Sequence, residues 1–356
     1  MNNWITRAFL LSIIAVCQTP TTHCNAQQAE ANPQLRRVEI SQVHMGVPFR
    51  IAIFAEDPLQ GIYIFQAFQR IKDLNQIFSD YEDESEISQL ARSYEVNVPQ
   101  QTSKTLFDLL QESQKINKRS EGAFDITISP LVKLWREGRK NNTLPSSEAR
   151  KKALQQVGFS NLKLNKKKQT VTFKQQGMQL DFGGIAKGYA VDEAVRILTE
   201  AGFKNVLVEA GGDLRVTGPP LDRESWNIGV APLDAEAEPS QLLALNNLAV
   251  ATSGDAFQYL EIDGKRYSHL VDSRTGKAVT TRSSVTIVAP TCTLADGLAS
   301  AVSVLGPAKG IELIEKYKNV YGFVVYIENN KVKTVASKNW NRLLQVSTKD
   351  PASTKD

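Results

Sequence analysis

One twelve-residue segment, DFGGIAKGYAVD at residues 181–192, constrains the fold of this chain more than any other feature. It joins an apolar, strand-like run to a helix through Gly183 and Gly184. Glycine lets a backbone approach a ligand closely, and the free N–H groups at a helix start carry a partial positive charge that favours anions. The segment therefore suits a phosphate, although glycine pairs also occur at strand-to-helix turns for packing reasons alone.

Two further segments carry side chains that are suited to chemistry. Residues 268–276, with sequence SHLVDSRTG, place His269 directly after a strand-like run. Asp296 and Ser300 are four residues apart and therefore share one face of a helix. Two hard oxygen donors on one face suit magnesium, which keeps few protein ligands. The alternative interpretation of this pair is a carboxylate near a helix start with an unrelated serine.

Other short motifs accompany these three segments in a fixed order along the chain. They include Met45-Gly46, residues 79–88, 122–135, 209–213 and 252–255. With this ordered set, which covers most of its length, the chain resembles the flavin transferases of the ApbE family, also called FAD:protein FMN transferases. An ordered series of motifs is far more specific than any one of them.

The resemblance implies that FAD is a substrate and is cut at its pyrophosphate. FMN would pass to a threonine or serine hydroxyl of an acceptor protein that carries a flavinylation motif, and AMP would be released. Mg²⁺ would neutralise the diphosphate, held by the backbone carbonyl of Gly184 together with Asp296 and Ser300. His269 would be the general base, a role that its near-neutral pKa suits. A purely structural histidine is the alternative.

Contacts with the flavin dinucleotide are also implied by the resemblance. Tyr81 would stack on the isoalloxazine ring, and Met45 would lie near the same pocket. The other implied contacts are Ala123, Phe124 and Asp125 beside the nucleotide, Asp181 and Lys187 at the adenosine part, and Leu270 through backbone or apolar contact.

Several of these assignments have an ordinary structural alternative. Asp181 could be a simple turn carboxylate, and Lys187 a surface lysine. Residues 211–213 (Gly-Gly-Asp) are interpreted as a tight turn between strands and left out of the site. The chain departs from the family pattern at Ala256, where relatives have tyrosine, and at Ser273, where they prefer proline. Neither change removes a metal ligand or the base.

The first 26 residues are typical of a secretory signal peptide, because Arg7 precedes a short apolar run and a small-residue site ends at Ala26. Cleavage there would leave Cys292 as the only cysteine and exclude an internal disulfide. Lipidation at Cys17, with membrane association, is the alternative. We expect an exported protein of the periplasm or cell envelope, with a linker over 27–37, one domain over 38–346 and a polar tail over 347–356.

Composition and patterning predict an α+β protein rather than a Rossmann fold. The 356 residues are 42% hydrophobic, so they can bury a large core. A net charge of +4 without an arginine-rich, aromatic-interleaved patch gives no support to nucleic-acid binding. The chain has no Gly-x-Gly-x-x-Gly and no Walker sequence, and its expected hairpins outnumber strand-helix-strand units. We therefore expect mixed, largely antiparallel sheets with flanking helices.

Hydrophobic periodicity predicts the positions of the elements. The expected helices span residues 59–78, 84–92, 102–119, 146–157, 293–304 and 307–317, with another that starts at Ala186. The expected strands lie in 38–54, 162–164, 170–173, 178–180, 206–208, 213–216, 226–231, 242–245, 248–252 and 284–289, with a final hairpin over 322–335 that turns at Asn329 and Asn330.

Three functions remain open at the level of sequence. The first is the transferase, and the second is a magnesium-dependent FAD pyrophosphatase in which water replaces the acceptor. The third is a non-catalytic flavin-binding lipoprotein of the periplasm. Retention of His269, Asp296 and Ser300 together favours turnover over storage, whereas the two enzymes share every residue of the site. The sequence identifies neither the acceptor protein nor the oligomeric state.

Overall fold

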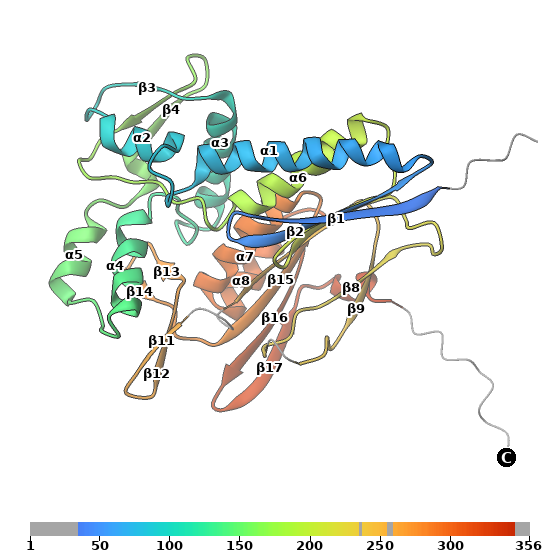
Figure 1. The fold of residues 1–356 in the computed structure, drawn as a ribbon. Coiled ribbons are helices and arrows are strands. Elements are labelled where there is room, and N and C mark those ends of the chain that lie inside the picture. Colours follow the sequence, from blue (N-terminus) through green and yellow to red (C-terminus); the bar gives the residue numbers. More distant parts are fainter. Residues whose placement is uncertain (1–34, 235–236, 255–258, 346–356) are drawn as a thin grey trace, which may run out of the picture. The chain divides into compact units, whose positions relative to one another are not determined.

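An eight-stranded sheet forms the centre of the protein in the computed structural model, which describes residues 35–234, 237–254 and 259–345 (Figure 1). Every neighbouring pair in the order β1-β2-β6-β7-β10-β15-β16-β17 is antiparallel. This sheet confirms the α+β prediction, because a Rossmann fold has a mostly parallel sheet. The strands are β1 (Arg36–His44), β2 (Val47–Ala55), β6 (Val206–Ala210), β7 (Asp213–Thr217), β10 (Ala249–Gly254), β15 (Ser283–Ala289), β16 (Tyr321–Glu328) and β17 (Lys331–Ala336).

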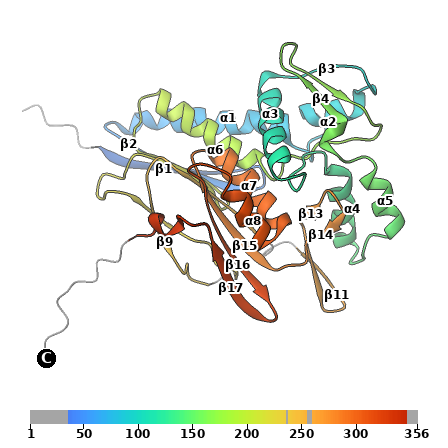
Figure 2. The ribbon, with the colours of Figure 1, turned by 180° about the vertical axis from the view of Figure 1, so that it is seen from behind.

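Helices cover one face of this sheet (Figures 1 and 2). They are α1 (Ile62–Phe78), α6 (Ala186–Glu200), α7 (Cys292–Leu305) and α8 (Pro307–Ile314). The helix α6 packs on β6 and β7, α7 on β10 and β15, and α8 on β16 and β17, while α1 packs along α6. Their apolar faces and the inward side chains of the sheet form the largest core cluster.

The opposite face of the sheet is covered by a second, smaller apolar layer. The hairpin of β8 (Trp226–Gly229) and β9 (Leu242–Leu245) and the short helix η3 (Trp340–Leu343) contribute to it. Trp340 stacks on Phe323 with ring centroids 5.3 Å apart. Because both faces are covered, every residue of β15 is buried, the polar Ser283, Ser284 and Thr286 included.

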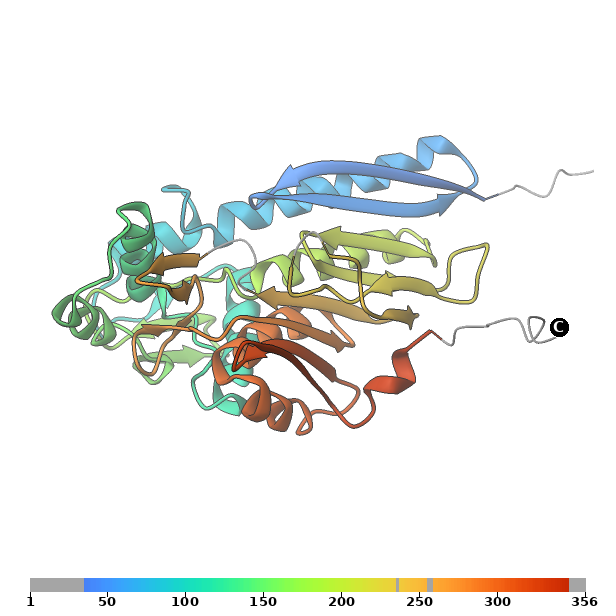
Figure 3. The ribbon, with the colours of Figure 1, turned by 90° about the horizontal axis from the view of Figure 1, so that it is seen from below.

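A third, small core lies at one side of the molecule and holds the histidine segment. It joins α4 (Ser129–Lys140) and α5 (Ser147–Leu154) to the strands β13 (Val271–Asp272) and β14 (Lys277–Ala278). The indole N–H of Trp135 donates a hydrogen bond to the Gly276 carbonyl at 3.0 Å. This side also contains α2 (Glu86–Ser93), α3 (Lys104–Arg119), β3 (Gln100–Gln101), β4 (Leu162–Asn165), β5 (Thr170–Phe173), η2 (Phe159–Asn161), β11 (Tyr259–Ile262) and β12 (Lys265–Ser268) (Figure 3). The short helix η1 (Pro58–Gly61) lies elsewhere, between β2 and α1, and contacts both.

Most of the predicted elements are present, with their ends shifted by a few residues. The hairpin between β16 and β17 turns at Asn329 and Asn330, whose φ angles are 52° and 58°. That conformation is the one that asparagine tolerates in two-residue hairpin turns. Ser103 caps α3 by accepting a hydrogen bond from the backbone N–H of Leu106 at 3.1 Å.

Three features of the structure differ from the prediction. The helix α4 was not expected, because its buried face is narrow and it contains Gly138. The expected strand over 178–180 is reduced to an isolated parallel bridge between Ile128 and Gln179. The β11–β12 hairpin was also missed, since its residues are half-exposed and carry little alternation.

The predicted signal peptide over 1–26, Cys17, most of the linker, Ala256 and the tail over 347–356 lie outside the described residues. Within the described ranges, no helix is both long and apolar enough to cross a bilayer. Cys292 is a buried free thiol.

The close approach of α6 to α7 depends on Gly188. A β-carbon at this position would lie 2.8 Å from Cβ of Asp296 and would collide with the carbonyl oxygen of Cys292. We predict that Gly188→Ala lowers the free energy of unfolding by about 1–3 kcal/mol, since the two helices must separate. Urea denaturation measures this change in the free energy of unfolding. The control is Gly61→Ala, whose new methyl would lie 3.6 Å from Val38; equal stability of the two variants would contradict the prediction.

Candidate active site

The glycine turn that precedes α6 is held by its own backbone and by Asp181. The N–H of Asp181 donates to the Ile126 carbonyl at 2.7 Å, and its carboxylate accepts the N–H of Gly183 at 2.7 Å. The N–H of Ala186 donates to the Phe182 carbonyl at 2.8 Å and starts the helix. Asp181 thus stabilises the turn, and its contact with the adenosine part stays a prediction.

Gly184, the last glycine of this turn, lies against α7. The hydroxyl of Ser300 donates to the Gly184 carbonyl at 3.4 Å. A β-carbon on Gly184 would lie 2.6 Å from the Ser300 hydroxyl oxygen and 3.6 Å from the ring of Phe124. The sequence assigned Gly184, Ser300 and Phe124 to one site, although they come from segments far apart in the chain. The structure brings these three residues together. Only a glycine allows this separation between the turn and the helix.

Asp296 lies one turn before Ser300 on α7 and faces α6. Its side chain is 5% exposed, and its carboxylate accepts the N–H of Gly188 at 3.0 Å. The neighbouring Lys187 forms an ion pair with Asp213, which is 1% exposed. One partly buried ammonium thus stands near two buried carboxylates.

The electrostatics of this cluster follow from burial. Burial raises the pKa of Asp213 to about 7, and the charge of Asp296 adds to the effect. Burial also raises the pKa of Asp296, against the opposing charge of Lys187. Burial lowers the pKa of Lys187, but the two carboxylates outweigh it, so this pKa stands above its usual value. The two carboxylates compete for one cation, and an added divalent cation would relieve that competition.

Asp213 is a residue that sequence analysis left out of the site. It begins β7 directly after the turn Gly211-Gly212, where φ is 54° and 98°. That turn was interpreted as a turn only, and the structure shows that it also delivers a carboxylate beneath α6. The Gly-Gly-Asp motif was the available signal, because two glycines allow the tight turn that starts β7 at Asp213.

Asp192 is a second residue that the sequence did not single out. Its carboxylate accepts the backbone N–H of Cys292 and of Thr293, each at 2.9 Å, and the Thr293 hydroxyl at 2.6 Å. It also pairs with Arg215 at 2.8 Å. Asp192 thus satisfies free N–H groups at the start of α7 from outside that helix, and it fixes the helix that carries Asp296.

The histidine segment forms a separate part of the site. His269 is half-buried and lies between β12 and β13. The flanking backbone is fixed by Val279, whose carbonyl accepts the Ser268 N–H at 2.8 Å and whose N–H donates to the Leu270 carbonyl at 2.9 Å. Further along, the Ser273 hydroxyl donates to the Gly122 carbonyl at 2.5 Å and joins this segment to the turn before Ala123. The serine that replaces the expected proline thus anchors the loop.

Asp125 is committed to the fold. It is 8% exposed, and one carboxylate oxygen accepts the N–H and the hydroxyl of Thr127 at 2.9 and 2.7 Å. The other oxygen accepts the N–H of Phe159 at 2.9 Å. Ala123 and Phe124 are buried beside it. The side chain of Asp125 therefore holds Thr127 and Phe159 in place, while the Phe124 ring lies against Gly184.

Tyr81 and Met45 occupy the ends of two other elements. Tyr81 follows α1, is 74% exposed, and has the guanidinium of Arg136 at 4.2 Å from its ring centroid. Arg136 also pairs with Asp80 at 3.2 Å. Met45 has a φ of 49° at the tip of the β1–β2 hairpin and packs partly against the main core.

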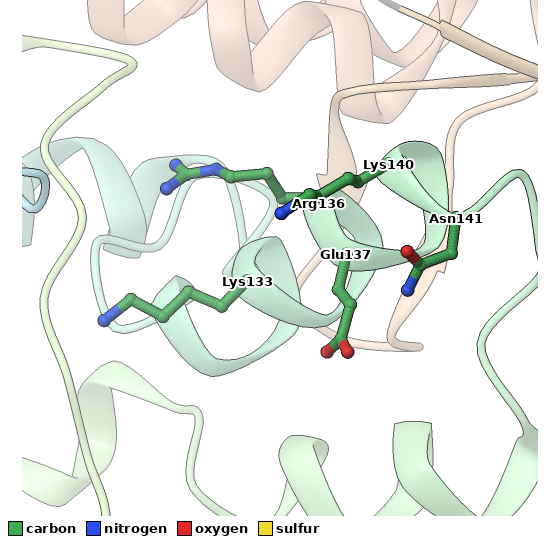
Figure 4. A pocket seen from close by; sticks show the side chains of 5 residues that line it. All are labelled: Lys133, Arg136, Glu137, Lys140 and Asn141. Carbon is green, nitrogen blue, oxygen red and sulfur yellow. The ribbon is translucent and has the colours of Figure 1, made fainter.

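Arg136 also lines a pocket of 390 Å³ on α4 (Figure 4). The other lining residues are Lys133, Glu137, Lys140 and Asn141. In Figure 4 the side chains of Lys133 and Arg136 extend to the same side of the helix. Basic side chains therefore dominate a concave surface next to the exposed ring of Tyr81.

The oxygen donors near Gly184 fit a hard divalent cation. They are one carbonyl, one hydroxyl and one buried carboxylate, from Gly184, Ser300 and Asp296, and Mg²⁺ completes its shell with water and phosphate oxygens. Among the described residues, no three His, Cys, Asp or Glu side chains gather into a metal-binding group. A cation site built from the oxygens of Gly184, Ser300 and Asp296 therefore depends on the close contact between the glycine turn and α7.

Comparison with known proteins places this geometry in a family. The ApbE family model matches residues 45–324. The FAD:protein FMN transferase of Haemophilus influenzae is 32% identical over 282 residues, which cover 77% of this chain and 81% of that protein. The flavin transferase ApbE of Vibrio cholerae matches in structure with a TM-score of 0.79 and 26% identity, over 87% of this chain and 100% of that one. The apo flavinyl transferase ApbE of Pseudomonas stutzeri has a TM-score of 0.78 and 27% identity, over 87% and 97%.

The raised pKa of Asp213 predicts how the stability of the metal-free protein depends on pH. A carboxyl group with a raised pKa in the folded state binds its proton more tightly there, so its contribution to stability falls as the pH rises toward and through about 7. Melting temperatures in EDTA should therefore fall more between pH 5 and 8 for the wild type than for Asp213→Asn. Parallel pH profiles for the two proteins would contradict this prediction.

The cap that Asp192 forms on α7 predicts a loss of stability. Asp192→Ala removes the acceptor of two backbone N–H groups and the partner of Arg215, and should lower the free energy of unfolding by about 2 kcal/mol. The control is Asp222→Ala, which breaks an exposed pair with Arg223 and should change little. Chemical denaturation compares the two, and similar losses would show that the cap is unimportant.

Proposed function

The chain belongs to the ApbE family, and on that premise we propose that it transfers the FMN part of FAD to a threonine or serine hydroxyl of an acceptor protein and releases AMP. The observation that carries the proposal is the meeting of Gly184, Asp296 and Ser300 at the α6–α7 contact. The positive end of the α6 dipole favours a diphosphate at this strand-to-helix turn, and the Ser300 hydroxyl of α7 lies directly beside it.

The reaction is a displacement at phosphorus. The oxygen of the acceptor hydroxyl forms a bond to the flavin-side phosphorus, and the bond from that phosphorus to the bridging oxygen breaks. AMP leaves with the bridging oxygen. Catalysis of this kind consists of alignment, charge stabilisation and removal of the hydroxyl proton. The turn at Gly184 aligns the diphosphate, and His269 takes the proton.

The fixed backbone of the histidine segment supports the assignment of His269. Because Val279 holds the residues on either side, the imidazole is presented from a defined loop rather than a mobile one. A general base must stand within hydrogen-bonding reach of the proton that it removes. An acceptor hydroxyl must therefore approach the side of the molecule where the small third core holds this loop.

Asp296, Ser300 and the Gly184 carbonyl would hold Mg²⁺. When bound, Mg²⁺ would neutralise charge on the phosphate oxygens. Lys187 remains beside Asp296 as a fixed cation at the adenosine side, and Asp213 keeps it there. The ion pair with Asp213 explains why a lysine lies in the first turn of α6, where the helix dipole disfavours a positive charge.

Residues 1–26 support an exported protein, as proposed from their charge and apolar pattern. Cleavage after Ala26 would release it to the periplasm, whereas lipidation at Cys17 would attach it to a membrane. The mass of the mature N-terminus, measured after expression with the full leader, distinguishes the two products.

The proposal predicts a covalent product. The mature protein, FAD, Mg²⁺ and an acceptor protein with a Ser/Thr flavinylation motif should yield an acceptor whose mass has increased by the FMN moiety, with AMP released in equal amount. EDTA should abolish the increase. Free FMN with an unmodified acceptor would favour the pyrophosphatase, and FAD that is bound but unchanged would favour the non-catalytic protein.

Variants separate the roles of the two proposed catalytic residues. His269→Ala should retain FAD binding and lose transfer by about 100-fold or more, as expected for a lost general base. Asp296→Ala should abolish turnover and also weaken FAD binding in Mg²⁺, because the cation is lost. The control is His44→Ala, since His44 stacks on Phe68 at 5.6 Å and should be needed only for packing. Full transfer by His269→Ala would show that the base has been assigned wrongly.

A further inference from the structure

The segment from α4 to α5 carries an unusual concentration of positive charge. Residues 129–154 contain seven Lys or Arg and two Glu, a net charge of +5, whereas the whole chain has a net charge of +4. The rest of the chain is therefore close to neutral. The helices α4 and α5 pack on each other and share the small third core, and we call the solvent-facing side of this pair the α4–α5 surface.

Most of these charges are not neutralised within the protein. Among the ion pairs of the described ranges, Arg136 with Asp80 is the one that involves this surface. Lys133 donates to the amide oxygen of Gln179, and Lys140 is exposed. The remaining cations of the surface are Arg139, Arg150, Lys151 and Lys152.

Two guanidinium groups of the surface have donors that nothing in the described protein accepts. Nη1 of Arg139 and Nε of Arg150 are buried atoms without a hydrogen-bond partner there. A buried donor that is left unpaired costs about 1–3 kcal/mol. The pocket of Figure 4, lined by Lys133, Arg136 and Lys140, opens on the same helix. An anionic group that entered it would meet several cations in a concave site.

The inner side of α4 supports the histidine segment. Trp135 stacks on Tyr267 with ring centroids 5.8 Å apart and donates to the Gly276 carbonyl. Tyr267 and Gly276 lie on either side of His269 in the chain. A hydroxyl that reaches His269 therefore brings the flanking parts of its own polypeptide close to α4.

We propose that the α4–α5 surface is the docking surface for an acidic segment of the acceptor protein. The inference rests on the proposed function, because it places the acceptor hydroxyl at His269. Charge complementarity of this type increases the rate of encounter and excludes basic partners. A concave site with interspersed carboxylates, such as Glu137, suits the separate acidic side chains of a polypeptide better than the uniform surface of a lipid bilayer.

Binding of a labelled peptide tests the proposal. The probe contains one threonine flanked by glutamates, and its matched control contains glutamines in their place. With the mature full chain at low ionic strength, fluorescence anisotropy should show that the glutamate peptide binds about tenfold more tightly or better. The advantage should shrink as salt screens the charges. Equal affinity for the two peptides would overturn the proposal.

Charge reversal locates the binding surface. The double variant Lys140→Glu with Lys151→Glu should lose the preference for glutamate, whereas Lys204→Glu with Lys338→Glu, exposed lysines outside residues 129–154, should retain it. FAD binding should be unchanged in both. Loss of FAD binding in the first variant would overturn the proposal, since the surface would then belong to the FAD site.

A vesicle experiment tests whether the surface binds an anionic lipid membrane instead of an acidic peptide. Phosphatidylglycerol vesicles that displace the glutamate peptide and bind more tightly to the wild type than to Lys140→Glu with Lys151→Glu would identify a membrane-facing surface and overturn the proposal. Peptide binding is measured without turnover. A failure of the docking proposal can therefore be told apart from a failure of the proposed FMN transfer.

Discussion

The contact between α6 and α7 is the interaction on which the rest of the site depends. At this contact the carboxylate of Asp296 accepts the N–H of Gly188, and the absence of a side chain on Gly188 lets the two helices approach. Four residues earlier in the chain, Gly184 meets Ser300 on the same helix. If α7 moved outward by the width of a methyl group, both of these contacts would be lost.

Two ion pairs of opposite polarity fix α6 on the sheet beneath it. Asp213 of β7 binds Lys187, and Arg215 of the same strand binds Asp192. A shift of α6 along the strand would bring like charges together, so the pairs specify its register as well as its attachment. Asp192 also caps α7. This one residue therefore connects β7, α6 and α7, the helix that carries Asp296 and Ser300.

The sequence predicted the α+β class, most helices and the segments of the site, because hydrophobic periodicity and glycine turns are local signals. It did not predict Asp213 as part of the cluster, since the contact with Lys187 exists only once β7 lies under α6. The hydrogen bonds that the oxygens of Asp125 accept from Thr127 and Phe159 were not predicted either, because no sequence spacing reveals such contacts.

A crystal soaked with FAD and Mg²⁺ would test the central claim most directly. The account predicts one cation within about 2.1 Å of oxygens from Gly184, Asp296 and Ser300, with the diphosphate of FAD on its open side. A cation bound elsewhere, or a diphosphate that lies away from these oxygens, would contradict it.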